Sequence, residues 1–178
     1  MLNIKENIPL AFYTTFKIGG KTKYFCEAET DEDIREAVLW AKKNNLPYFV
    51  LGGGSNLLVS DEGFEGLIIK ISSSGFQVSS DKIIADAGVP LAKIVNEAAN
   101  AGLSGLEWAI GIPGTIGGAI CGNSGAYGRS ISESIVGGKI MDSKGKIADF
   151  KNKDFLFRYR GSILKEKNNN LIVVKVEL

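Results

Sequence analysis

Residues 112–128 read IPGTIGGAICGNSGAYG, with six glycines among seventeen positions and no simple repeat. Because glycine lacks a Cβ and accepts positive φ, a dense and irregular set of glycines carries an entropic cost that an ordinary loop avoids. Thr115, Asn123 and Ser124 interrupt the glycines, where pure packing would favour Ala or Val. The stretch therefore favours a backbone surface that contacts a long polar ligand over a glycine helix that only packs on a sheet.

A second glycine-rich segment, GGGSN at residues 52–56, directly follows the apolar run 48–51. A turn at the carboxyl end of a strand can direct successive backbone N–H groups into one concavity that binds phosphate oxygens. A tight connection between two strands explains three glycines equally well. The pattern is not the dinucleotide fingerprint, because the β-like run 57–59 follows in place of a long helix. Two such segments in one small chain suggest one extended ligand held between them.

The composition narrows the functional classes. The 178 residues are 44% hydrophobic, and Lys and Arg number 21 against 20 for Asp and Glu, so no basic field attracts nucleic acid or an anionic membrane. No apolar run approaches the roughly 20 residues of a membrane span, and the N-terminus lacks the order of a signal peptide. We therefore expect a soluble, cytoplasmic protein without a nucleic-acid or membrane partner.

The chain contains no histidine, and its two cysteines are far apart. The missing histidine excludes Ser-His-Asp and Cys-His nucleophile systems and histidine-ligated metals. Cys26 and Cys121 are too few for a disulfide framework or a zinc site, and we interpret Cys26 as a buried apolar residue. If the protein is an enzyme, a bound cofactor rather than a metal is expected to carry the chemistry.

The order of predicted elements indicates an α+β fold. A strand at 23–29, a helix capped by Thr30 and ending near residue 44, and a strand at 48–51 form a probable right-handed crossover unit. In that helix Ile34, Val38, Leu39 and Ala41 are predicted to form the apolar face. Further strands are predicted at 57–59, 67–71, 75–78, 83–87, 135–141, 146–150 and 171–178, and helices at 90–102 and 152–157. We expect two α/β lobes with mixed sheets, about 1–72 and 73–178.

A third constellation of interest is Phe157-Arg158-Tyr159-Arg160-Gly161-Ser162. In a strand the two arginines would share one face, whereas in a tight turn they would diverge. Either could be an ordinary solvated arginine. Arg160, beside a tyrosine and a glycine, is a candidate for bidentate binding of a carboxylate.

Four motifs, in order along nearly the whole chain, resemble the bacterial UDP-N-acetylenolpyruvoylglucosamine reductases, also called UDP-N-acetylmuramate dehydrogenases. The motifs are TFKIGG at 15–20, GGGSNLL at 52–58, GIPGTIGG at 111–118 with its continuation NSGAYG at 123–128, and YRGS at 159–162. The resemblance implies an FAD-binding domain of the vanillyl-alcohol oxidase or PCMH type, with noncovalent FAD between two lobes. The absence of histidine agrees with noncovalent binding.

In this family NADPH reduces the flavin, which then reduces the enolpyruvyl double bond of UDP-N-acetylglucosamine enolpyruvate to UDP-N-acetylmuramate, a precursor of peptidoglycan. The resemblance makes Arg160 the catalytic arginine, and Tyr159 with Arg160 the contacts to the UDP-sugar substrate. It places the cofactor contacts at Gly52, Gly53, Gly54, Ser55, Asn56, Leu57, Pro113, Gly114, Thr115, Gly117, Gly118, Asn123, Ser124, Ala126 and Tyr127.

The resemblance also implies a C-terminal substrate-binding domain that supplies a serine proton donor and a glutamate. Neither segment occurs in these 178 residues. We therefore expect a chain that binds FAD and turns over poorly alone, with the serine and glutamate on a separate or missing domain. Two alternatives remain open: a flavin oxidoreductase of the same superfamily with another substrate, and a noncatalytic nucleotide-binding module.

Overall fold

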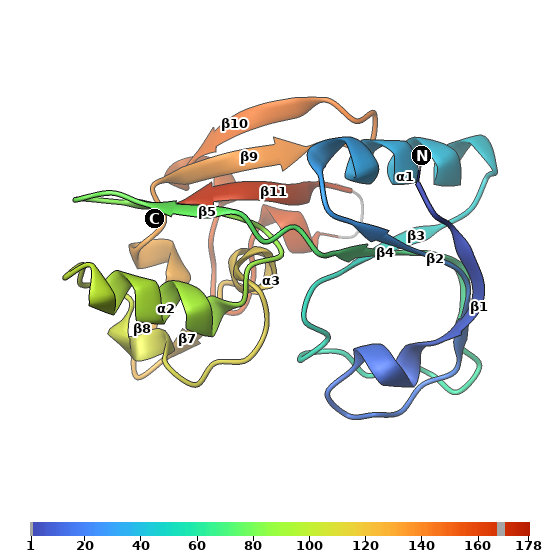
Figure 1. Ribbon diagram of the computed structural model, residues 1–178, viewed down its shortest axis with the longest axis horizontal. Helices are drawn as coiled ribbons and strands as arrows, with labels where there is room; N and C mark the ends of the chain where they lie inside the picture. The colour runs from blue at the N-terminus through green and yellow to red at the C-terminus, as the bar shows by residue number, and fades with distance from the viewer. Residues whose placement is uncertain (1, 167–169) are drawn as a thin grey trace. The chain divides into compact units, whose positions relative to one another are not determined.

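The computed structural model describes residues 2–166 and 170–178 of the chain. The chain divides into two compact units, Met1–Ser73 and Ser74–Leu178. Each unit combines a β-sheet with helices, which confirms the α+β class expected from the order of elements (Figure 1). Among the helices of the described residues, none has the length and apolar character that a membrane crossing requires.

The first unit is built on a four-stranded sheet with the order β1-β2-β4-β3. Its outer strand β1 pairs antiparallel with β2, whereas β2 and β3 both run parallel to β4. A helix, α1, connects β2 to β3, so the predicted strand-helix-strand unit is present, with β4 inserted between its two strands. The bounds are β1 Lys5–Pro9, β2 Lys21–Ala28, α1 Asp31–Lys43, β3 Tyr48–Leu51 and β4 Phe64–Ile71, with a 3-10 helix η1 at Leu10–Tyr13.

Helix α1 begins at the residue that the sequence predicts. The Thr30 hydroxyl accepts a hydrogen bond from the Asp33 N–H over 3.1 Å, and the Asp33 carboxylate accepts one from the Thr30 N–H over 2.9 Å. This capping box satisfies two backbone donors at the start of the helix. Leu39, expected on the apolar face, is instead 46% exposed, because it lies one position off the stripe formed by Ile34, Ala37, Val38 and Ala41.

The strand expected at residues 57–59 is absent from the structure, where these residues form part of an irregular connection. Leu57 and Val59 pack against the buried cluster formed by Leu10, Phe25, Leu51 and Ile68. Their apolar character therefore reflects burial of side chains against the core, and no ladder of backbone hydrogen bonds is involved. The connection carries the chain directly from the glycine-rich turn back to β4.

The second unit is built on a five-stranded sheet with the order β10-β9-β11-β6-β5, in which each neighbouring pair is antiparallel. The closing strand β11 lies inside the sheet, between β9 and β6. A separate two-stranded hairpin is formed by β7 and β8. The bounds are β5 Phe76–Val78, β6 Ile83–Asp86, β7 Gly125–Ala126, β8 Arg129–Ser130, β9 Gly137–Met141, β10 Ile147–Lys151 and β11 Ile172–Glu177.

Two α-helices accompany this sheet, α2 at Leu91–Asn100 and α3 at Ile116–Gly122. Pro90 is the cap of α2 rather than its first helical residue. Helix α3 contacts β11 and β6, and α2 contacts β6 and α3, so the glycine-rich helix rests on the centre of the sheet. The helix expected at 152–157 is a 3-10 helix that ends at Phe155, because Leu156 has a φ of 46°. This helix is η4, Asn152–Phe155, and the other 3-10 segments of the unit are η2 Glu107–Ala109, η3 Ile131–Glu133 and η5 Ile163–Lys165.

Candidate functional site

The GGGSN turn follows the last residue of β3 in the first unit. Gly54 is buried with a φ of 67°, and a Cβ at this position would overlap the carbonyl group of Tyr13. Its own carbonyl oxygen accepts a hydrogen bond from the Thr15 N–H over 3.1 Å. Gly54 is therefore required for the turn to pack on residues 13–15, whereas Gly53 is exposed.

This turn presents backbone donors that the chain itself does not use. Within the described residues, the N–H groups of Gly53, Gly54 and Asn56 have no hydrogen-bond partner. An unpaired amide is uncommon where it is buried, as at Gly54, whereas the exposed Gly53 and Asn56 are open to solvent. Successive free N–H groups after the carboxyl end of a strand can bind anionic oxygens. The Leu57 side chain packs on the core, so only its backbone is available to a ligand at this turn.

In the second unit, the chain enters α3 through an antiparallel bridge between Pro90 and Thr115. The first amides of the helix are already satisfied: the Ile116 N–H donates to the Val89 carbonyl over 2.9 Å, and the Gly117 N–H donates to the Ala87 carbonyl over 2.9 Å. The Gly118 N–H reaches the Thr115 hydroxyl at 3.4 Å. The start of α3 is therefore held against the turn that follows β6.

The two adjacent glycines of α3 have different structural roles. A Cβ on Gly117 would come within 2.7 Å of the Ala87 Cβ, so this glycine permits close packing of helix and sheet. Gly118 is exposed, and a Cβ there would meet only the Thr115 hydroxyl, at 3.5 Å. Just before the helix, the N–H groups of Gly114 and Thr115 have no partner among the described residues, although Thr115 is buried.

The glycine run ends in the β7–β8 hairpin, whose tip is formed by Tyr127 and Gly128. Both residues have positive φ, 52° and 78°, as a two-residue type I′ connection requires. Such a turn ordinarily contains Asn and Gly, and an aromatic residue in this conformation is strained. Tyr127 is nevertheless 88% exposed, so nothing in the core explains its presence. Upstream, the Ser124 N–H donates to Ala119, and Ala126 pairs with Arg129.

Arg160 lies in a tight turn, which settles the choice between strand and turn. Arg158 and Gly161 exchange two backbone hydrogen bonds, of 3.0 and 3.1 Å, and Arg160 has a φ of 55°. The Arg160 Nη1 donates to the Gly125 carbonyl over 2.9 Å, while Tyr159 is 91% exposed. The structure thus brings the YRGS motif together with the end of the second glycine run.

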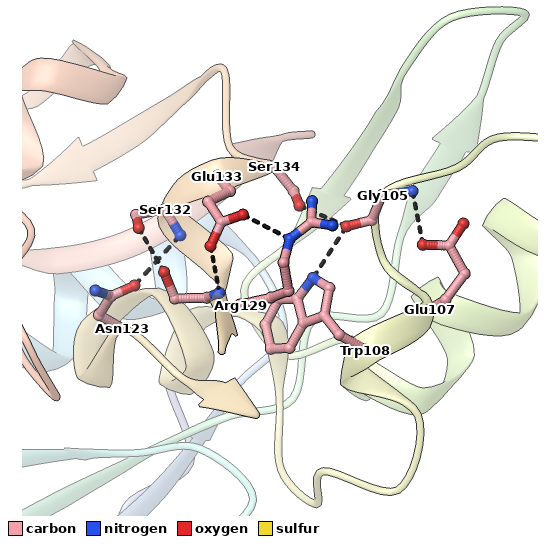
Figure 2. Close-up of polar contacts among 9 residues, drawn as sticks. Gly105, Glu107, Trp108, Asn123, Arg129, Ser132, Glu133 and Ser134 are labelled. Carbon is pink, nitrogen blue, oxygen red and sulfur yellow. Dashed lines mark hydrogen bonds and ion pairs between the residues drawn. The ribbon is translucent and has the colours of Figure 1, made fainter. Parts of the chain in front are cut away.

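Sequence reasoning did not single out Ser162 or the polar network around Gly105. Ser162 is fully buried, and its hydroxyl donates to the Cys121 carbonyl over 2.9 Å. The Gly105 carbonyl accepts hydrogen bonds from the Trp108 indole at 3.0 Å and the Ser134 hydroxyl at 2.8 Å (Figure 2). Membership of the YRGS motif is the one sequence signal for Ser162, and the Gly105 network has none.

Neither cysteine is suited to nucleophilic chemistry. Burial, with smaller contributions from Asp33 and Glu27, raises the pKa of the Cys26 thiol to about 12. Burial also raises the pKa of Cys121, against the opposing effect of Lys165. Since the thiolate is the nucleophile, both side chains are inert near neutral pH. Within residues 2–166 and 170–178, no group of three or more His, Cys, Asp or Glu side chains is arranged to hold a metal ion.

Comparison with known proteins connects these features to a family. The family model described as "FAD binding domain" matches residues 22–151. The UDP-N-acetylenolpyruvoylglucosamine reductase of Synechococcus sp. (strain JA-3-3Ab) is 42% identical over 165 residues, which are 92% of this chain and 53% of the relative. The enzyme of the same name from Clostridium tetani (strain Massachusetts / E88) is 40% identical over 178 residues, 99% of this chain and 57% of the relative.

Solved structures agree on the fold. The crystal structure of UDP-N-acetylenolpyruvylglucosamine reductase (MurB) from Thermus caldophilus superposes with a TM-score of 0.83 at 31% identity, covering 99% of this chain and 61% of that one. A cholesterol oxidase from Brevibacterium sterolicum superposes with a TM-score of 0.75 at 16% identity, covering 99% of this chain and 37% of that one, which shows the shared fold alone.

Within each unit, the unpaired amides of the glycine-rich segment suit anionic oxygens such as those of the FAD diphosphate, and the neighbouring glycines keep side chains away from these donors. The chain spans about half the length of the curated relatives it matches. It belongs to the FAD binding domain family and, over that part of their length, is similar to the UDP-N-acetylenolpyruvoylglucosamine reductases.

Proposed function

We propose that this chain is the flavin-binding part of a cytoplasmic UDP-N-acetylmuramate dehydrogenase, which reduces the enolpyruvyl double bond of UDP-N-acetylglucosamine enolpyruvate in peptidoglycan precursor synthesis. The observation that carries the proposal is the anchored turn of Arg160. An arginine at a φ of 55° is strained, and such strain persists at functional sites where the surroundings hold it. The names of the relatives identify the substrate class that this arginine would serve.

FAD is proposed to bind without a covalent bond. In the first unit, the unpaired N–H groups of Gly53, Gly54 and Asn56 would donate to anionic oxygens of the cofactor. In the second unit, the N–H groups of Gly114 and Thr115 would do the same, and the exposed Gly118 leaves the surface of α3 open. The remaining proposed contacts are Gly52, Ser55, the Leu57 backbone, Pro113, Gly117, Ser124, Ala126 and Tyr127. When bound, FAD would supply the redox chemistry, accepting reducing equivalents from NADPH and passing them to the double bond.

Arg160 is proposed to bind the substrate carboxylate. Its guanidinium already donates one hydrogen bond to the Gly125 carbonyl, which would reduce the side-chain freedom lost when a carboxylate binds. The same positive charge would stabilise the negative charge that develops next to the carboxylate during reduction. Tyr159, exposed beside it, would contact the same substrate. The serine proton donor and the glutamate are proposed to come from a further domain outside these residues.

Purified protein tests the proposal in two steps. Flavin absorbance is expected in the purified chain or after FAD is added. Absence of FAD binding would contradict the assignment of this chain as a flavin-binding part. The FAD-loaded chain is then titrated with UDP-N-acetylglucosamine enolpyruvate while the flavin spectrum is recorded. We expect a saturable spectral change that Arg160→Ala abolishes and the control Arg35→Ala preserves, with FAD content equal in all three.

A second measurement separates this function from that of another flavin oxidoreductase. Oxidation of NADPH is followed with the enolpyruvyl sugar and with unrelated alcohols and sugars as acceptors. Slow stimulation, by the enolpyruvyl sugar alone, is expected, because the proposed proton donor is not among these residues. Stimulation only by another acceptor would assign the chain to a different reaction, and loss of flavin in Arg160→Ala would make that arginine structural.

A further inference from the structure

We infer that Asn123 is a positioning residue that holds the turn carrying Arg160, and that its side chain does not contact the cofactor. The inference rests on the proposed role of Arg160 in binding a carboxylate. It reassigns a residue that the family resemblance places among the FAD contacts. The argument starts from what the Asn123 side chain touches.

Asn123 ends helix α3 in the left-handed conformation, with φ 43° and ψ 60°. Asparagine tolerates this conformation better than most residues, which explains its place as the helix cap. Its backbone N–H donates to the Ile120 carbonyl over 3.2 Å, and only 8% of the residue is exposed. The backbone donor is therefore used within the helix, and the side chain is directed into the unit.

Both polar groups of the Asn123 side chain have partners inside the chain. Its Nδ2 donates to the Arg158 carbonyl over 2.9 Å, and its Oδ1 accepts from the Ser132 N–H over 3.3 Å. Figure 2 shows the contact with Ser132. The amide thus connects the end of α3 to two different segments, and neither of its groups depends on a ligand.

The segment on the Ser132 side is itself well held. The Ser130 N–H donates to the Glu133 carboxylate over 2.9 Å at the start of η3. The Ser132 carbonyl accepts a hydrogen bond from the Asn152 amide over 2.7 Å. Asn123 is therefore bonded on one side to a segment that has hydrogen bonds of its own, and on the other side it holds the turn that contains Arg160.

The turn on the Arg158 side is attached to α3 at both of its ends. Asn123 holds Arg158, the first residue of the turn, and the Ser162 hydroxyl binds Cys121 just after the turn. Between these attachments Arg160 adopts its φ of 55°, a backbone conformation that is unfavourable for a residue other than glycine. A strained conformation is retained only where neighbouring contacts enforce it. The hydrogen bond from Asn123 is one of several that hold this turn, beside the Ser162 bond, the Arg158–Gly161 backbone pair and the Lys165 Nζ, which donates to the Arg160 carbonyl over 3.4 Å.

The side chain of Arg160 is held by the same end of α3. Its Nη1 donates to the carbonyl of Gly125, two residues after Asn123. Hydrogen bonds to residues 121–125 thus fix both the turn that carries the Arg160 backbone and the Arg160 guanidinium. Loss of the Asn123 amide is expected to release the backbone of the turn and, with it, the direction of the guanidinium.

The test compares two asparagine-to-glycine changes made at left-handed positions of the FAD-loaded chain. Asn123→Gly keeps a backbone that accepts positive φ and removes the amide. Asn45→Gly makes the same change at an exposed residue with a φ of 53° after α1. Backbone heteronuclear NOEs of residues 159–161 and the Arg160 Nε–H signal are recorded by NMR. We expect lower NOEs and a shifted or broadened Nε–H signal in Asn123→Gly, and no change in Asn45→Gly.

A third variant isolates the donor. Asn123→Asp tolerates the left-handed conformation and retains an acceptor for Ser132, but it cannot donate to the Arg158 carbonyl. It is expected to loosen the turn as Asn123→Gly does. An ordered turn in both Asn123 variants would overturn the inference.

The affinities for the sugar substrate and for FAD distinguish a positioning role of Asn123 from direct contact with the cofactor. In Asn123→Gly the affinity for UDP-N-acetylglucosamine enolpyruvate is expected to fall about tenfold, as for the loss of one well-placed hydrogen bond, with FAD affinity unchanged. A fall in FAD affinity with an ordered turn would make Asn123 a cofactor ligand and overturn the inference. A loosened turn with unchanged sugar affinity would leave Asn123 as the holder of the turn and would contradict the proposed role of Arg160.

Discussion

The Ser162 hydroxyl donates to the carbonyl oxygen of Cys121 over 2.9 Å, joining two residues that are 41 positions apart in the sequence. Because Ser162 is fully buried and Cys121 is partly buried, replacing the hydroxyl leaves the Cys121 carbonyl without this donor in a largely desolvated place. Ser162→Ala is expected to lower the free energy of unfolding by about 1–2 kcal/mol, measured by urea denaturation. Ser80→Ala, at an exposed position, serves as the control, and equal stability of the two variants would contradict the prediction.

Gly53 and Gly54 are expected to respond differently to substitution. Gly53→Val should lower FAD occupancy without loss of fold, because the exposed position lies beside unpaired amides. Gly54→Ala should destabilise the protein itself, because a Cβ there overlaps the Tyr13 carbonyl and the φ is 67°. Flavin absorbance per chain and thermal unfolding separate the two effects. Normal flavin content in Gly53→Val would remove this turn from the cofactor site.

Arg160 provides a test of strain that does not depend on activity. Arg160→Ala and Arg160→Gly both remove the guanidinium, but only glycine adopts a φ of 55° without strain. The glycine variant should therefore be more stable than the alanine variant by about 1 kcal/mol, measured by urea denaturation. An alanine variant as stable as the glycine variant would show that the turn relaxes and carries no strain.

Cys26 predicts how stability changes at alkaline pH. Burial raises its pKa from 9.0 to about 12 in the folded chain, so the folded state retains a proton that the unfolded state loses. The resulting stabilisation is complete below about pH 9 and is lost as the pH rises toward 12. The free energy of unfolding of the native chain should therefore fall more steeply over this range than that of Cys26→Ala. Parallel curves for the two proteins would contradict the assignment.

Helices and strands that depend on residues close together in the sequence could be predicted from it. Thr30 and Asp33 lie three residues apart and close the capping box that starts α1, and the four residues of β3 form a compact apolar run ahead of the glycines. The closing strand was also predicted, but its place between β9 and β6 was not, because pairing between distant strands has no local signature. The prediction of a strand at 57–59 was wrong, because an apolar run whose side chains pack on the core has the same sequence pattern as a strand that pairs in a sheet.

The sequence by itself determined the glycine-rich segments, the α+β class and the candidate arginine, because glycine content, periodicity and residue type are properties of neighbouring positions. Only the tertiary structure separated the packing role of Gly117 from the open surface at Gly118, and only it placed Arg160 in a strained turn. Asn123 shows the physical reason. Its hydrogen-bond partner Arg158 is 35 residues away, and such a contact exists only after the chain has brought the two segments together.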